Sequence, residues 1–172
     1  MILRDALPQD AEALAELGRA SFCATFGHLY DPADLAAFLE EVHAVPAVAA
    51  EISDPAIFHQ LAVDPATEAL IGYVKLKHPG GYAGYSDAAN PITLGQLYTA
   101  PGRTGEGIGA ALMDWALALA RGKGADAVQL SVWSENTRAQ RFYQRYGFAK
   151  IADIDFYVGN TRDDEFLYEL RL

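Results

Sequence analysis

The sequence predicts an α/β protein in which about seven strands alternate with helices. Segments in which apolar and polar residues alternate are separated by segments whose apolar residues recur with the helical period. Between residues 92 and 133, a strand, a helix and a second strand follow one another, which predicts a right-handed crossover. The 172 residues suffice for a single domain, 1–172, with a substantial core.

The first third of the chain is predicted to be a short strand followed by helices. Residues 1–4 are apolar and form a first or edge strand, and a helix runs from about residue 10 to residue 22. The segment 25–30 interrupts this helix, and Asp31-Pro32 starts another, because proline suits the first helical turn. A third short helix is predicted over 46–52.

The rest of the chain supplies most of the strands. Residues 58–64 and 70–77 alternate in polarity and are joined by a short turn, so we expect an antiparallel hairpin. A loop follows over 79–91. A later helix over 134–146 is expected to end at Gly147 in a left-handed cap. Further strands are predicted over 127–133, 148–157 and 165–172.

The stretch from Leu97 to Trp115 is the centre of the predicted fold. A strand ends at Pro101, glycines follow at 102, 105, 107 and 109, and a helix begins. The first N–H groups of a helix lack internal partners, so this turn is a candidate anion site. It lacks the Gly-Lys-Ser/Thr of a P-loop, and Leu112 replaces the last glycine of the dinucleotide pattern GxGxxG. A tight connection without a ligand is the alternative.

The same turn resembles the pyrophosphate loop of the GNAT acyltransferases, [Q/R]xxGxG/A. Its six positions here are Thr104, Gly105, Glu106, Gly107, Ile108 and Gly109, followed by Ala110. Thr104 stands where the family usually has glutamine or arginine, and Arg103 lies one residue earlier. Thr104 could donate its hydroxyl to a phosphate, and Arg103 could supply positive charge.

A second stretch resembles the GNAT signature NxxAxxFYxxxGF. It matches at every defined position, namely Asn136, Ala139, Phe142, Tyr143, Gly147 and Phe148. The segments TFGHLYDPADLAAFL and VGNTRDDEFLYELRL are similar to the PaiA-type polyamine acetyltransferases within the superfamily. The resemblance implies the GNAT fold, with a central mixed, mostly antiparallel sheet of about seven strands flanked by helices, and it implies acetyl-CoA as the cofactor.

By this resemblance, the cofactor lies along the strand end and the glycine turn. The backbone groups of Leu97, Tyr98 and Thr99 are expected to pair with pantetheine amides, which requires the central strands to splay apart at a bulge. The residues from Arg103 to Ala110 are expected at the pyrophosphate. Asn136 is implied to contact the cofactor, and capping of the following helix is the alternative.

Tyr143 is expected to act as the general acid. A thiolate is a better leaving group when a proton donor is nearby, and a tyrosine hydroxyl is neutral at pH 7. The resemblance implies that this tyrosine lies beside the sulfur. The alternative is a core aromatic residue whose hydroxyl reaches the surface.

The general base is left open. Related enzymes often have a glutamate on the central strand, but Thr93 and Gly95 stand at the corresponding places and neither can act as a base. His28, Glu135 and a chain of water molecules are the candidates.

The break between the first two helices is expected to bind the acceptor through Phe26, His28 and Tyr30. An acidic patch for a polyamine could use nearby carboxylates, although ordinary solvated helix charges explain most of them. These carboxylates are Asp31, Asp34, Glu40 and Glu41.

Composition excludes several other classes of function. The net charge of −10 argues against nucleic acid as a partner, because phosphates are bound by lysine and arginine. Cys23 is the sole cysteine, so neither a disulfide nor a cysteine-based metal site is expected. We expect no signal peptide and no membrane span, because long apolar runs are absent, and hence a cytoplasmic protein.

The leading hypothesis is an acetyl-CoA-dependent N-acetyltransferase that acts directly on a primary amine of a small molecule. The PaiA-type resemblance makes a polyamine such as spermidine or spermine the leading acceptor, with an amino acid, an antibiotic or a protein N-terminus as alternatives. A non-catalytic CoA-binding or regulatory module is a rival, and a structural protein without cofactor is another. The resemblance leaves a homodimer open, and no stretch of the sequence indicates its interface.

Overall fold

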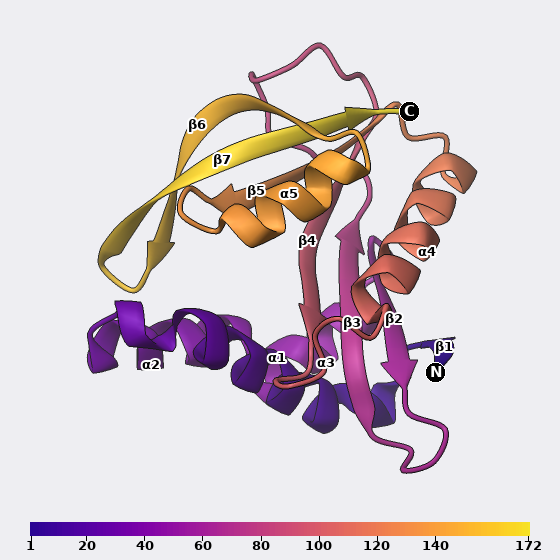
Figure 1. The fold of residues 1–172 in the computed structure, drawn as a ribbon, viewed down its shortest axis with the longest axis vertical. Coiled ribbons are helices and arrows are strands. Elements are labelled where there is room, and N and C mark those ends of the chain that lie inside the picture. The colour runs from indigo at the N-terminus through magenta and orange to yellow at the C-terminus, as the bar shows by residue number, and fades with distance from the viewer.

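The computed structural model describes residues 1–172 and contains one seven-stranded sheet with helices on both faces (Figure 1). Its strands are β1 (Ile2–Asp5), β2 (Ile57–Val63), β3 (Leu70–Lys77), β4 (Pro91–Thr99), β5 (Ala127–Trp133), β6 (Ala149–Val158) and β7 (Thr161–Arg171). They lie in the order β1-β2-β3-β4-β5-β7-β6. Only β4 and β5 are parallel neighbours. The predicted mixed, mostly antiparallel sheet is therefore confirmed.

The helices cover the sheet in two layers. They are α1 (Ala11–Phe26), α2 (Pro32–Val42), α3 (Val45–Ser53), α4 (Ile108–Gly122) and α5 (Thr137–Arg145), with short 3-10 turns at Pro8–Asp10 and Gly27–Leu29. One apolar core lies between the sheet and α4 with α5, and a second lies between the sheet and α1 with α3. None of these helices is both long enough and apolar enough to cross a membrane.

Local sequence explains where several helices begin and end. The carboxylate of Asp31 accepts a hydrogen bond from the Ala33 amide and caps α2, as its proline-led start suggested. Gly147 has a φ of +93° at the end of α5, which is the predicted left-handed conformation. The helix expected to stop near residue 22 continues to Phe26, because residues 23–26 contain neither glycine nor proline.

The hairpin of β6 and β7 bends over the end of the molecule that carries α2 (Figure 1). A carboxylate of Asp34 on α2 accepts hydrogen bonds from the Asn160 amide at 2.9 Å and the Thr161 hydroxyl at 2.7 Å. A Cβ at Gly159 would lie 2.5 Å from the same carboxylate. We call these contacts between α2 and the tip of the hairpin the Asp34 clasp.

Candidate active site

The candidate site is a gap in the sheet between β4 and β5. The two strands pair only from Pro91 to Thr93, opposite residues 127–129 of β5. Beyond Thr93 they diverge (Figure 1), and a cleft of about 620 Å³ lies between them. Its walls include side chains from α1 on one face of the sheet and from α5 on the other. The cleft therefore joins the two faces of the sheet.

A bulge in β4 determines which side chains enter the cleft. Lys75 of β3 is opposite Gln96, and the next residue of β3 is opposite Leu94, so Gly95 is an extra residue in β4. Leu94 packs in the core beneath α4, whereas Gln96 accepts a hydrogen bond from the Tyr73 hydroxyl at 2.8 Å on the α1 side. The side chain that this strand presents toward α1 beside Tyr73 is thus a neutral amide.

The turn between β4 and α4 exposes backbone amides that have no partner. None of the N–H groups from 104 to 110 donates to another group of the chain. Gly105 and Gly107 have φ values of +93° and +79°, which glycine adopts without strain. Gly107 is the N-cap of α4, and no side chain caps this helix. The positive end of α4 is therefore open to an anion.

Arg103 is already paired within the chain. Its Nε donates to the Glu106 carboxylate at 2.8 Å, and its terminal nitrogens lie 3.3 Å from an Asp64 oxygen. The hydrogen bond from the Ala66 amide, and then the hydrogen bonds from the Arg103 guanidinium, lower the pKa of the Asp64 carboxyl. The open amides, rather than Arg103, are the uncommitted anion-binding groups of this turn.

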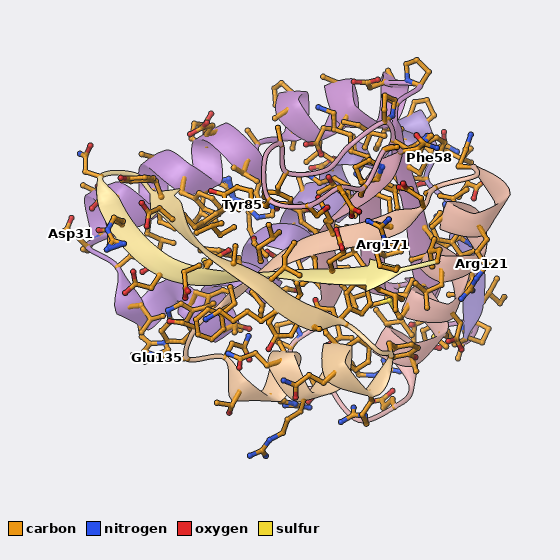
Figure 2. All side chains as sticks on the ribbon, turned by 90° about the horizontal axis from the view of Figure 1, so that it is seen from above. Asp31, Phe58, Tyr85, Arg121, Glu135 and Arg171 are labelled. Atoms are coloured by element: carbon orange, nitrogen blue, oxygen red, sulfur yellow. The ribbon has the colours of Figure 1, made fainter.

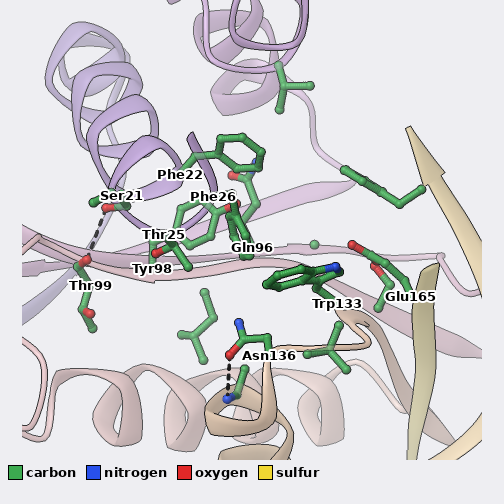
Figure 3. A pocket seen from close by; sticks show the side chains of 18 of the residues that line it. Ser21, Phe22, Thr25, Phe26, Gln96, Tyr98, Thr99, Trp133, Asn136 and Glu165 are labelled. Carbon is green, nitrogen blue, oxygen red and sulfur yellow. Dashed lines mark hydrogen bonds between the residues drawn. The ribbon is translucent and has the colours of Figure 1, made fainter. Parts of the chain in front are cut away.

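Two side chains reach the cleft from α5 and the residue before it. The Asn136 side-chain oxygen accepts a hydrogen bond from the Ala139 amide at 3.1 Å and caps α5, and the residue also borders the cleft (Figure 3). Tyr143 is 9 % exposed, and its hydroxyl donates to no group of the chain. Burial first, and then the charge of Glu165, raise the pKa of the Tyr143 hydroxyl, so it holds its proton at neutral pH.

Aromatic side chains form the wall on the α1 side. The Phe22 ring lies 4.5 Å from that of Phe38 and 5.1 Å from that of Phe26, measured between centroids. Phe26 in turn meets Trp133, at the end of β5, edge to face at 6.0 Å. Figure 3 shows Phe22 and Phe26 on one side of the strands and Asn136 on the other. This part of the cleft, which we call the aromatic chamber, is apolar and rigidly packed.

The charged side chains that border the cleft are both carboxylates. Glu41 lies on α2 and is exposed, whereas Glu165 lies on β7 beside Trp133 (Figure 3). One oxygen of Glu165 is buried without a hydrogen-bond partner. The cleft therefore offers negative charge to whatever enters the aromatic chamber.

Residues 19–148 match the family model described as the acetyltransferase (GNAT) family. The chain belongs to the GNAT acetyltransferase family. It is 30% identical over 162 residues to an uncharacterised N-acetyltransferase of Mycobacterium tuberculosis, covering 92% of this chain and 95% of that protein. It is 27% identical over 165 residues to an uncharacterised N-acetyltransferase from the pepI 3′ region of Lactobacillus delbrueckii subsp. lactis, covering 95% of this chain and 93% of that protein.

The fold is similar to that of the PaiA N-acetyltransferase from Thermoplasma acidophilum in complex with coenzyme A. The TM-score is 0.79 at 24% identity, over 99% of this chain and 98% of that chain. As a GNAT enzyme, the protein is an N-acetyltransferase that uses acetyl-CoA. Its own residues fit this cofactor, because open amides with nothing within 4 Å of a Cβ at Gly105 or Gly107 suit a pyrophosphate. The β4 edge beyond Thr93, unpaired with β5, suits an extended amide chain.

The GNAT cleft gathers many of the predicted site residues. Those that border it are Phe26, Leu97, Tyr98, Thr99, Thr104, Asn136 and Tyr143. The other members of the predicted pyrophosphate loop lie in the adjoining turn and the first turn of α4. His28 is exposed and does not border the cleft, and the Tyr30 hydroxyl donates to the Asp163 carboxylate instead. Glu135 is exposed on the outside of the molecule (Figure 2).

Several polar or aromatic residues of the cleft were not expected from the sequence, among them Gln96, Trp133 and Glu165. Gln96 enters because the bulge reverses the alternation of β4, which a regular strand would not predict. Trp133 and Glu165 are opposite each other because β7 pairs with β5. The only signal in the sequence is a glutamate inside a strand, next to the apolar residues Phe166 and Leu167.

Proposed function

We propose that this protein transfers an acetyl group from acetyl-CoA directly to a primary amine of a small molecule. The cleft between β4 and β5 carries the proposal, because one passage joins the open amides to the aromatic chamber. Two substrates entering from opposite faces of the sheet would meet within it. Cys23 borders a separate cavity between α1 and α2, which supports a route without an acyl-enzyme.

Acetyl-CoA, when bound, supplies a thioester whose acetyl carbon accepts a nucleophile. In this proposal the amides from 104 to 110 bind the pyrophosphate, and Thr104 contributes its hydroxyl. The backbone of Leu97 to Thr99 pairs with the pantetheine arm as an added strand. One carbonyl of this segment, that of Thr99, already accepts a hydrogen bond from the Ser21 hydroxyl at 3.2 Å. The backbone groups that are not used by this bond or by the pairing with β3 would orient the arm.

Tyr143 serves as the general acid in this proposal. Its hydroxyl is uncommitted, borders the cleft and is held protonated by its raised pKa. It can therefore give its proton to the departing sulfur. The ring is fixed by contacts with Phe142 and Phe148, whose centroids lie at 5.4 Å and 5.8 Å, so the donor is positioned in advance.

The acceptor is proposed to be a cationic amine, with a polyamine as the leading candidate. Both charged side chains that border the cleft are acidic, and the aromatic faces of the chamber also attract cations. Phe26 is part of that chamber, whereas His28 and Tyr30 would act from outside it. A cytoplasmic location and a homodimer remain predictions.

The test is release of free thiol from acetyl-CoA with a panel of amines. The panel contains spermidine, spermine, an α-amino acid, an aminoglycoside and a short peptide with a free N-terminus. We expect turnover that requires an amine, with the polyamines fastest. Turnover with another member would keep the transferase and replace the acceptor.

A non-catalytic CoA-binding module is the second candidate. The neutral Gln96 on β4 and the paired Arg103 favour it, because neither offers a free charge to a substrate or to the cofactor. Such a module would bind acetyl-CoA and release no thiol with any amine of the panel. Binding and turnover measured on the same preparation therefore separate the two.

A further inference from the structure

One carboxylate of the cleft has an oxygen atom without a partner in the chain. Glu165 of β7 is the cross-strand neighbour of Trp133, and the two side chains lie next to each other in Figure 3. Its Oε2 atom is buried and accepts no hydrogen bond. Burying a carboxylate oxygen away from water without a hydrogen-bond donor costs free energy. Such a group in a ligand-sized cleft indicates that a donor from outside the chain completes it.

The surroundings of Glu165 contain no cation that could serve instead. The other charged residue bordering the cleft is Glu41. Tyr98 on β4, Tyr143 on α5 and Tyr82 in the loop after β3 are close enough for the charge of Glu165 to raise their pKa values. An ammonium group entering the cleft would therefore meet one carboxylate with an unpaired oxygen, among neutral hydroxyls and aromatic faces.

The carboxyl group of Glu165 and the hydroxyls of the tyrosines around it titrate in different pH ranges. Burial raises the pKa of the Glu165 carboxyl, the Ser131 hydroxyl lowers it, and the charge of Asp163 raises it again, with a net rise. Asp163 itself accepts a hydrogen bond from Tyr30. The neighbouring tyrosines have raised pKa values, so they remain protonated while Glu165 titrates.

We propose that Glu165 is the general base of this enzyme, and that it binds the ammonium group of the acceptor and removes a proton from it. The inference rests on the proposed transferase function and assigns the base that the sequence left open. It also defines the acceptor class as an alkylammonium cation, because a neutral or anionic nucleophile would leave the buried carboxylate uncompensated.

Glu165 takes one proton from the ammonium group, which leaves a neutral amine with a free electron pair. The amine nitrogen forms a bond to the acetyl carbon as the carbon–sulfur bond breaks. The electron pair left on sulfur takes the proton of the Tyr143 hydroxyl, and Tyr143 recovers a proton from the acylated nitrogen. Glu165 then releases its proton to water, so one proton is released in each turnover.

The first test compares the wild type with Glu165→Gln and with a matched control, Glu169→Gln. Glu169 lies on the same strand and face, opposite Gln129, and does not border the cleft. With the panel amine that has the highest kcat/KM, we expect Glu165→Gln to lose about 100-fold or more in kcat/KM at pH 7. We expect the control, which removes the same charge, to retain its activity.

The pH profile separates a base from a structural residue. In the wild type, kcat/KM should rise with pH and level off above the pKa of Glu165, well below the pKa of the amine. In Glu165→Gln it should keep rising toward the pKa of the amine, because only the already neutral amine reacts. In Ser131→Ala the acid limb should move to higher pH, because the lost hydrogen bond had favoured the charged carboxylate.

A binding measurement supplies a readout besides activity. Calorimetric titration of the same amine into protein saturated with coenzyme A, in two buffers of different ionisation enthalpy, counts the protons released. Near the pKa of Glu165 we expect proton release from the wild type and at least a tenfold weaker affinity without that release in Glu165→Gln. Unchanged affinity for coenzyme A shows that the variant is folded.

The outcomes distinguish this inference from the function on which it rests. No thiol release by the wild type with any amine would overturn the transferase proposal and the base with it. Wild-type turnover with an unaltered rate and pH profile in Glu165→Gln would overturn the base alone. Retained amine affinity with a lost acid limb would overturn the binding role and keep the proton transfer.

Discussion

Tyr143 shows how one residue serves the core and the cleft together. Its ring belongs to the apolar core under the sheet, between Phe142 and Phe148, and its hydroxyl is left without a partner at the cleft. Burial keeps the proton on the hydroxyl by raising its pKa. Packing and proton donation thus depend on different atoms of the same side chain, so they can be separated by substitution.

The substitution Tyr143→Phe removes only that hydroxyl. We expect kcat to fall by about 100-fold, while the Kd for acetyl-CoA changes by less than about threefold, because the proton is needed only as sulfur departs. Steady-state kinetics and equilibrium binding check the two quantities. Tyr85→Phe, at a tyrosine that is 47% exposed and does not border the cleft, is the control and should match the wild type. Equal losses in rate and affinity would contradict the acid role.

At the scale of elements, the segment from β4 through the turn to α4 provides the groups proposed for the cofactor. β4 separates from β5 after Thr93 while it stays paired with β3, the turn exposes amides, and the N-cap of α4, Gly107, provides no side-chain cap. The dipole of α4 adds positive potential at the same point. Arg103 is tied to Glu106 and Asp64, so backbone groups carry most of the attraction for a pyrophosphate.

Gly107→Asp and Gly107→Asn test that attraction as a pair. Both side chains are of similar size, both suit an N-cap, and both tolerate positive φ better than most residues do. The aspartate adds a negative charge where the pyrophosphate is proposed to bind. We therefore expect the aspartate variant to have a Kd for coenzyme A about tenfold higher than that of the asparagine variant. Calorimetry measures both. Identical affinities in the two variants would show that this turn is not the anion site.

The Asp34 clasp connects two elements that lie far apart in the sequence. It fastens the tip of the β6–β7 hairpin to α2, and Phe38 of α2 packs against Phe156 of β6 at 5.9 Å between ring centroids. Both rings border the cleft, so the clasp helps to close the aromatic chamber. It does not touch the turn before α4.

Asp34→Ala should therefore act on the amine and spare the cofactor. We expect the KM for the amine to rise about threefold to tenfold, because two hydrogen bonds that hold the chamber closed are lost. The KM for acetyl-CoA should stay near that of the wild type. Asp34→Asn keeps one acceptor oxygen and should lose less. A rise confined to the KM for acetyl-CoA would contradict a role of the Asp34 clasp in closing the aromatic chamber.

At the scale of the whole molecule, the contrast between local and distant contacts explains what the sequence predicted. The turn before α4 and the segment from Asn136 to Phe148 are each continuous in sequence, so their spacing already predicted a turn at the start of α4 and a helix that carries Tyr143. Glu165 entered the cleft only because β7 inserts between β5 and β6, and that strand order is not readable from alternation. The bulge at Gly95 likewise reversed the alternation of β4, so that Gln96 and Leu94 face opposite sides of the sheet, which a regular strand would not predict.

The most direct measurement is the initial rate of thiol release while acetyl-CoA and the best panel amine are varied together. A passage that joins both faces of the sheet predicts that both substrates are bound when the acetyl group moves. Double-reciprocal plots should therefore give intersecting lines, and Cys23→Ser should give the same pattern at the wild-type rate. Parallel lines, or thiol released from acetyl-CoA before any amine is added, would contradict direct transfer.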